Sequence, residues 1–350
     1  MATNEARAQR RGVGPGRINL IGDHTDYNQG LALPMAIGLE VAVTFEPRSE
    51  PWIEVTSDAY PGERTSIPSV VDPHTIDDVE PAWARLVAAV VSFARPASGG
   101  LVHVSSTLPR GSGLSSSAAL AVALADVFGV EGNALVLARL CQAAEHRIGV
   151  PVGLMDPLVS AGGRVGNALL IDFHTLAVRH VPVPPGAEWT VVDSGQRRDL
   201  RTSAYATRVA ECEAAAAVIG PLGLATPADV LGLRDPLLRR RARHVMTECA
   251  RVTEMAHALA HEDLVQAGHL MDGSHRSLAD EFEASNPELD GLVADLRARP
   301  GVHGARVTGA GFGGCVVVLG EPGAIDPGAP GPPAWRVTPS DGTVARRASG

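Results

Sequence analysis

The stretch LPRGSGLSSSAAL, residues 108–120, joins two glycines and three consecutive serines to a run of alanines. Gly111 and Gly113 allow the backbone to approach a ligand closely. The serines predict the start of an alanine-rich helix, whose unpaired N–H groups and dipole favour a bound phosphate. A serine-capped helix after a glycine turn also occurs for structural reasons alone, but the triple serine favours the phosphate interpretation. The missing GK[ST] ending means that the loop is not a Walker A motif.

The basic residues narrow the chemistry further. The sequence contains no lysine, so all 30 of its basic residues are arginines. A Walker A lysine, the strand lysine of protein kinases and a Schiff-base lysine are therefore excluded. Any phosphate chemistry in this chain must use arginine, backbone amides and a metal ion.

Bulk composition bounds the class of protein. The chain has 350 residues, a formal net charge of -9 and 45% hydrophobic residues, as expected of a globular protein with two domains. The negative charge argues against nucleic acid or an anionic membrane as a partner. The four cysteines lack CxxC spacing, and residues 1–11 lack the apolar core of a signal peptide. The most apolar stretch, residues 118–127, is too short to span a membrane, so we expect a cytoplasmic protein. We also expect this protein to be a monomer.

Hydrophobic periodicity predicts a mixed α/β chain in two parts. Strands are predicted over residues 39–45, 100–107, 167–172, 190–193, 304–308, 315–319 and 335–338. Helices are predicted over residues 81–93, 115–128, 133–148, 205–219, 237–261, 264–282 and 286–297. Prolines and a glycine cluster in PVPPGAE, residues 182–188, so we predict one domain over residues 1–186 and a second over residues 187–350.

A second polar segment, GPGRINLIGDHTDYNQG, occupies residues 14–30. Asp23, His24 and Asp26 follow a glycine and an apolar core at residues 18–21. Carboxylates accept hydrogen bonds from hydroxyls, and His and Asn supply donors or acceptors, so the cluster suits recognition of a polyol. Because Asp, Asn and Gly also form turns, a plain turn explains the segment equally well.

A third segment, VTGAGFGGCV, occupies residues 307–316 and places four glycines around Phe312 between two predicted strands. So many glycines weaken backbone order, which makes sense where the chain passes close to a ligand or another loop. A tight hairpin is the alternative. Taken alone, this glycine pattern carries little information.

In this order and spacing, the three segments resemble the three motifs of the GHMP kinases, which include galactokinase, homoserine kinase, mevalonate kinase and phosphomevalonate kinase. GRINLIGDHTDYNQG closely resembles the signature of the galactokinase branch. Further matches are QAAEH ending at His146, GLMDP ending at Pro157, TSAYATRVAEC around Tyr205 and SHRSLADEFEASNPELDGLV ending at Val293. The resemblance covers roughly residues 12–319.

The resemblance implies an α+β two-domain GHMP kinase fold. Its N-terminal α/β domain resembles domain 2 of ribosomal protein S5, its C-terminal domain is ferredoxin-like, and the active site lies in the cleft between them. It also implies an ATP-dependent sugar-1-kinase that phosphorylates the anomeric hydroxyl of galactose. The small-molecule partners would be the sugar and ATP, with Mg²⁺ as the metal cofactor.

Site roles follow from the matching positions. Asp156 resembles the catalytic aspartate, and Arg17 the arginine that holds it ionised and stabilises the moving phosphoryl group. Ser117 and Glu145 match the Mg²⁺ ligands. The phosphate-wrapping positions are Gly111, Ser112, Gly113, Leu114, Ser115, Ser116 and Ser117. The sugar-contacting positions are Asp23, His24, Thr25, Asp26, Gly153 and Tyr205.

The sequence departs from the family pattern at several positions. Asp23 stands where most galactokinases have glutamate, which shortens the side chain by one methylene, and GLMDP replaces the usual GIMDQ. The segment WARLVA, residues 83–88, resembles the WANYVKG segment of the family, which lies near the nucleotide base. It lacks the tyrosine, lysine and glycine of that segment, so the contacts with adenine should differ. Two alternatives stay open: a kinase for N-acetylgalactosamine, arabinose or a sugar acid, and an inactive sugar-binding regulator.

Overall fold

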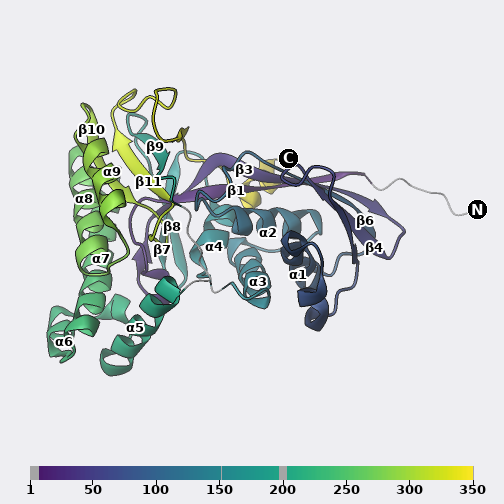
Figure 1. Cartoon of the computed structure of the whole chain (residues 1–350), viewed down its shortest axis with the longest axis horizontal. Coiled ribbons are helices and arrows are strands. Elements are labelled where there is room, and N and C mark those ends of the chain that lie inside the picture. The colour runs from purple at the N-terminus through teal and green to yellow at the C-terminus, as the bar shows by residue number, and fades with distance from the viewer. Residues whose placement is uncertain (1–7, 151, 197–202, 350) are drawn as a thin grey trace, which may run out of the picture.

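The computed structural model describes residues 8–150, 152–196 and 203–349. Within these ranges the strands form three sheets (Figure 1). The largest sheet has the order β1-β3-β6-β4-β5, and only its β4–β6 pair is parallel. Its strands are β1 (Arg10–Asn19), β3 (Pro34–Arg48), β4 (Trp52–Ser57), β5 (Arg64–Pro68) and β6 (Gly99–Ser106).

Helices lie on one side of this sheet (Figure 1). They are α1 (Arg85–Ala94), α2 (Ser116–Val127), α3 (Ala134–Arg147) and α4 (Met155–Gly162), with α2 and α4 directly against its strands. The alanine-rich α2 lies against β1 and β3. A Cβ atom on Gly14 of β1 would lie 2.0 Å from the carbonyl oxygen of Ala119, so glycine allows the strand and helix backbones to touch.

The second part of the chain builds an antiparallel sheet in the order β10-β11-β9-β12. These strands are β9 (Glu188–Asp193), β10 (Val302–Val307), β11 (Cys315–Gly320) and β12 (Ala334–Val337). The helices of this part are α5 (Ser203–Ile219), α6 (Pro227–Gly232), α7 (Pro236–Ala260), α8 (Leu264–Asp280) and α9 (Pro287–Arg297). Helices α8 and α9 pack on β10, and α7 packs on α8.

Two features join the parts. A small sheet of β2 (Leu31–Ala32), β7 (Asn167–Asp172) and β8 (Ala177–Pro182) contacts α7. The C-terminal helix α10 (Thr343–Ser349) returns to pack on α4 and β1. One apolar cluster runs from Ile18 on β1 through Val252 on α7 to Val317 on β11. The interface between the parts is therefore packed like a core, which holds the pocket described below in shape.

Every predicted helix and strand is present, with ends shifted by a few residues. The structure adds β1, β2, β4, β5, β8, α4, α6 and α10, which the periodicity did not predict. The glycine-rich third segment forms the connection between β10 and β11, and residues 321–333 connect β11 to β12. No helix in the described ranges has both the length and the apolar character needed to cross a bilayer.

Candidate active site

A pocket of about 250 Å³ opens where the three motifs meet. Its walls come from β1, the loop before α2, the start of α4, the residues after β1 and the β10–β11 connection. The lining residues that the sequence singled out are Arg17, Asp23, His24, Asp26, Gly111, Gly113, Ser115, Ser116, Ser117, Gly153, Asp156 and Tyr205. Residues from both parts of the chain therefore face one cavity.

Arg17 and Asp156 form a two-pronged ion pair at the pocket wall. Arg17 Nε donates to Asp156 Oδ1 at 2.8 Å, and Nη2 donates to Oδ2 at 2.7 Å. The third nitrogen, Nη1, donates to the Gly113 carbonyl at 2.9 Å. Arg17 is 4% exposed, so this planar fork fixes the carboxylate in one orientation. Asp156 lies in the first turn of α4, where the helix dipole also favours negative charge.

The loop before α2 combines tight turns with an unobstructed helix start. Gly111 and Gly113 have φ angles of 71° and 76°, which glycine adopts without steric cost. Ser116 and Ser117 open the helix and line the pocket. The amide groups of this first turn have no carbonyl partner within the helix, so the loop can receive an anion such as a phosphate.

Glu145 on α3 is a buried carboxylate without a hydrogen-bonding partner among the described residues. It is 1% exposed, and neither side-chain oxygen is satisfied. Burial raises the pKa of Glu145 to about 7, against the opposing effect of the nearby Ser117 hydroxyl. An unsatisfied buried carboxylate beside a serine hydroxyl is an oxygen donor set that suits a hard divalent cation. The described residues contain no cluster of three metal-ligating side chains, so other oxygens would have to complete the coordination shell.

The opposite wall carries a loop with polar side chains. Asp26 packs against Gly153 so closely that a Cβ on Gly153 would lie 1.6 Å from Asp26 Oδ2. Burial, followed by the neighbouring charge of Asp156, raises the pKa of Asp26 to about 6. His24, with a φ of 63°, contacts the Tyr27 hydroxyl through Nδ1 and the Ala310 carbonyl through Nε2. The Tyr205 ring lies 5.7 Å from the His24 ring, which closes this side of the pocket.

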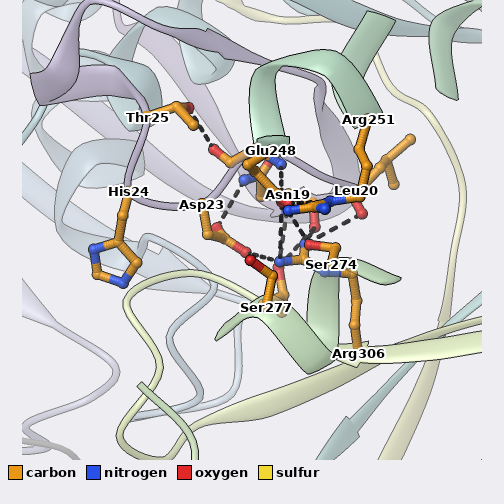
Figure 2. A network of polar contacts seen from close by, with 12 residues as sticks. Asn19, Leu20, Asp23, His24, Thr25, Glu248, Arg251, Ser274, Ser277 and Arg306 are labelled. Atoms are coloured by element: carbon orange, nitrogen blue, oxygen red, sulfur yellow. Dashed lines mark hydrogen bonds and ion pairs between the residues drawn. The ribbon is translucent and has the colours of Figure 1, made fainter. Parts of the chain in front are cut away.

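Asp23 sits at the base of this wall in a buried polar network (Figure 2). Its Oδ1 accepts hydrogen bonds from Asn19 Nδ2 at 2.7 Å and the Gly309 amide at 3.1 Å. Its Oδ2 accepts from Arg306 Nη2 at 2.5 Å. Asp23 and Arg306 are 1% and 0% exposed. The pair thus ties the first motif to the third.

Glu248 on α7 extends the network from the other side. Its Oε1 accepts from the Gly22 amide at 2.9 Å and from Ser274, while Oε2 accepts from Arg251. Burial opposes the charge of Glu248, but Arg251 and Arg306 together lower its pKa to about 2. The residues before Asp23 are therefore fixed by α7 as well as by β10.

Family models match three stretches of the chain. The galactokinase galactose-binding signature matches residues 6–47, the GHMP kinases N terminal domain matches residues 84–164, and the GHMP kinases C terminal model matches residues 255–326. The human protein named galactokinase is 40% identical over 326 residues, which cover 89% of this chain and 83% of that protein. The chain belongs to the galactokinase family. A Mycobacterium bovis galactokinase is 41% identical over 322 residues, with 87% of each chain covered.

Solved structures agree with this assignment. The galactokinase of Lactococcus lactis, crystallised with galactose, superposes with a TM-score of 0.87 at 28% identity and covers 97% of this chain and 96% of its own. The mevalonate kinase of Methanococcus jannaschii superposes with a TM-score of 0.68 at 18% identity, which bears on the fold alone. The predicted GHMP kinase fold is confirmed, and the chain is a kinase of the galactokinase family.

Four predicted site residues of this galactokinase-family chain do not line the pocket: the buried Glu145, and Thr25, Ser112 and Leu114. Thr25 is fully buried, and its hydroxyl donates to the carbonyls of Gly22 and Leu31, so it holds the turn between these residues from within. The Ser112 hydroxyl donates to Pro109. The Leu114 side chain packs in the apolar core. The sequence signal for these residues was their place in a motif, which cannot say which way a side chain points.

Arg306, Asn19 and Glu248 are residues that the sequence reasoning missed. Asn19 lies inside the segment at residues 14–30, and Arg306 directly precedes the glycine-rich segment at residues 307–316. Glu248 lies on a helix with other charged residues, and its place in the sequence does not distinguish it from them. Only their burial and their contacts with the segment at residues 19–24 mark them as part of the site.

Proposed function

We propose that this kinase transfers the γ-phosphoryl group of ATP to the anomeric hydroxyl of galactose and forms galactose 1-phosphate. The observation that carries the proposal is the Arg17–Asp156 ion pair, which faces one pocket between the serine-led start of α2 and the loop of Asp26 and His24. A phosphate donor and a polyol acceptor would meet at this pair. Catalysis of phosphoryl transfer depends mainly on such positioning and charge neutralisation.

The reaction assigns one task to each wall of the pocket. The sugar C1 oxygen forms a bond to the γ-phosphorus while the bond from that phosphorus to the bridging oxygen breaks, and ADP leaves with the electron pair. The proton of the C1 hydroxyl goes to Asp156. Arg17 keeps Asp156 oriented and offers positive charge to the phosphoryl oxygens. Asp26, His24 and Tyr205 would hold the other sugar hydroxyls by hydrogen bonds.

We assign the metal site to Glu145 and Ser117, with phosphate oxygens and water completing the shell of a Mg²⁺ ion. Such an ion would neutralise charge on the triphosphate. We further propose a cytoplasmic monomer with domains over residues 1–186 and 187–350. The residues after Pro339 would then join the first domain in space, since Pro339 bridges to Ile37 and α10 packs on α4. The buried reduced thiols of all four cysteines suit a reducing compartment.

A panel of sugars tests the reaction. Purified protein with Mg²⁺-ATP should release ADP in the presence of galactose, and phosphate should appear on C1 of the product by ³¹P NMR. Glucose, which differs at the C4 hydroxyl, should be at least about tenfold poorer in kcat/KM, since one unpaired polar group costs 1–3 kcal/mol. A preference for N-acetylgalactosamine, arabinose or a sugar acid would replace the galactose assignment. Failure with every sugar would leave only a binding role.

Glu145→Gln tests the metal assignment. The variant should need at least about tenfold more Mg²⁺ for half-maximal rate, because a charged oxygen ligand is lost. Its Tm without nucleotide should equal or exceed that of the wild type, because the substitution removes an uncompensated buried charge. Glu131→Gln, on an exposed residue just before α3, serves as the control and should change neither quantity. An unchanged Mg²⁺ requirement in Glu145→Gln would contradict the assignment.

A further inference from the structure

The Ser115 side chain does not do what a serine at its position ordinarily does. Ser115 is the N-cap residue of α2, and an N-cap serine usually accepts a hydrogen bond from an amide of the first turn. Ser115 makes no such bond. Its hydroxyl instead donates to Asp156 Oδ2 at 2.5 Å, across 41 residues of sequence. Ser115 was expected to hold phosphate, but its hydroxyl instead contacts the carboxylate of Asp156.

The backbone of Ser115 explains this direction. Its φ and ψ angles are 64° and 43°, a left-handed conformation that costs a non-glycine residue about 1–3 kcal/mol and persists only where the surroundings enforce it. In this conformation the hydroxyl makes no cap hydrogen bond to the first amides of α2 and contacts Asp156 instead. The Ser115 carbonyl still accepts from the Ala119 amide at 3.0 Å, so the helix begins normally. Ser115 therefore leaves the start of α2 open to an anion and at the same time contacts the carboxylate of Asp156.

The hydrogen bonds to Asp156 show what the Ser115 contact achieves. Among the residues that the structure describes, Oδ2 accepts from Arg17 Nη2 and from the Ser115 hydroxyl, whereas Oδ1 accepts from Arg17 Nε alone. A carboxylate oxygen has two lone pairs, so these donors fill both sites on Oδ2 and leave one on Oδ1. The Ser115 hydroxyl has a single proton, which it gives to Asp156. It has no second proton to donate to a phosphate.

We propose that Ser115 is a positioning residue for Asp156, and that it selects Oδ1 as the oxygen that receives the proton of the sugar hydroxyl. The inference rests on the proposed phosphoryl transfer to a sugar and deepens it. Arg17 adds a parallel link, because its Nη1 holds the Gly113 carbonyl in the same loop. The loop that binds phosphate and the carboxylate that meets the acceptor are thereby locked together through two side chains.

Two substitutions at Ser115 distinguish the contribution of its hydroxyl from the contribution of its left-handed backbone. Ser115→Ala and Ser115→Gly both remove the donor to a charged acceptor, a contact worth about 10- to 100-fold, so kcat should fall by that factor in both. The KM for ATP and the Kd for ATP measured without sugar should stay within about twofold. Glycine relieves the left-handed strain, so Ser115→Gly should unfold at the same or higher temperature despite its lost activity. A loss caused by damaged folding would instead follow the Tm.

Two more variants complete the test. Ser115→Thr keeps the hydroxyl and should recover most of kcat, although a β-branched residue fits this backbone poorly and should lower the Tm. Ser116→Ala is the matched control beside it, and should raise the KM for ATP more than it lowers kcat. Unchanged kcat in both Ser115→Ala and Ser115→Gly would overturn the inference, as would a rise in the KM for ATP at unchanged kcat. A wild type that is inactive on all sugars would instead overturn the proposed function and this inference with it.

Discussion

Asp156→Asn should lower kcat by about 10²- to 10⁴-fold, the usual contribution of a positioned general base. The amide keeps the size of the carboxylate but cannot take the proton of the sugar hydroxyl. Its NH₂ group would also face a donor, because Arg17 donates to one oxygen and both Arg17 and Ser115 donate to the other. The measurement is ADP release under saturating galactose and ATP. The Kd for ATP should change little, since Asp156 faces the acceptor.

A second aspartate provides the control for this experiment. Asp272 is 7% exposed and paired with Arg297 at 2.5 Å, but it does not line the pocket. Asp272→Asn should reduce stability without changing kcat, which separates loss of an ion pair from loss of catalysis. Asp156→Ala should reproduce the loss of turnover and still bind ATP. Near-normal turnover in either Asp156 variant would overturn the role of this residue.

The sequence predicted the elements whose patterning is local. The alanine-rich α2 and the helices of the second part have clear periodicity, and they appear with ends shifted by a few residues. Strand β1 was missed because RRGVGPGRIN is rich in glycine and proline, which disfavour strands. In the structure those glycines serve tertiary contact, since Gly14 lies against the backbone of α2. Local propensity cannot reveal such a contact in advance.

Helix α4 was missed for a related reason. Its sequence, MDPLVSAG, is short and contains Pro157. In the first turn of a helix the absent N–H of proline costs nothing, because that group has no partner within the helix. The substitution of proline in the GLMDP segment is therefore compatible with the helix that presents Asp156. The same short helix places Asp156 beside Arg17, a pairing across 139 residues that only family resemblance could suggest.

The base of the proposed sugar site was least accessible to sequence reasoning. Asp23 was expected to contact the sugar directly. It does line the pocket, but three protein donors hold its two oxygens. Its partner Arg306 lies 283 residues away, and neither the charge pattern nor the spacing connects the two. The shorter side chain of aspartate is here matched to a buried arginine.

Arg306→Met should reduce the free energy of unfolding by about 3–5 kcal/mol, the usual cost of removing one partner from a buried ion pair. The substitution leaves Asp23 buried with one fewer donor, and Arg306 also holds the carbonyls of Asn19 and Leu20. Because these contacts fix the segment that leads into His24 and Asp26 (Figure 2), we expect the KM for galactose to rise at least about tenfold. The KM for ATP should rise much less. Chemical denaturation and steady-state kinetics measure the two effects.

A second variant with a similar loss of stability serves as the control for the effect of Arg306→Met on the KM for galactose. Leu289 is fully buried in the core between α9 and the second sheet, away from the pocket, and Leu289→Ala should cost about 2–5 kcal/mol. Its KM for galactose should match that of the wild type. If Arg306→Met and Leu289→Ala had the same galactose KM, Arg306 would support the fold alone.

Removing the second charge decides whether Asp23 and Arg306 act as a pair. In Asp23→Asn/Arg306→Met the stranded carboxylate is gone, so part of the stability lost in Arg306→Met should return. The KM for galactose should stay high, because the bond that holds the loop to β10 is still missing. Glu248 keeps Arg251 as its ion-pair partner in this double variant, which preserves the anchor of Gly22 to α7. Recovered stability with an elevated galactose KM would show that the ion pair fixes the sugar loop, whereas additive losses in stability would mean that the two residues act independently.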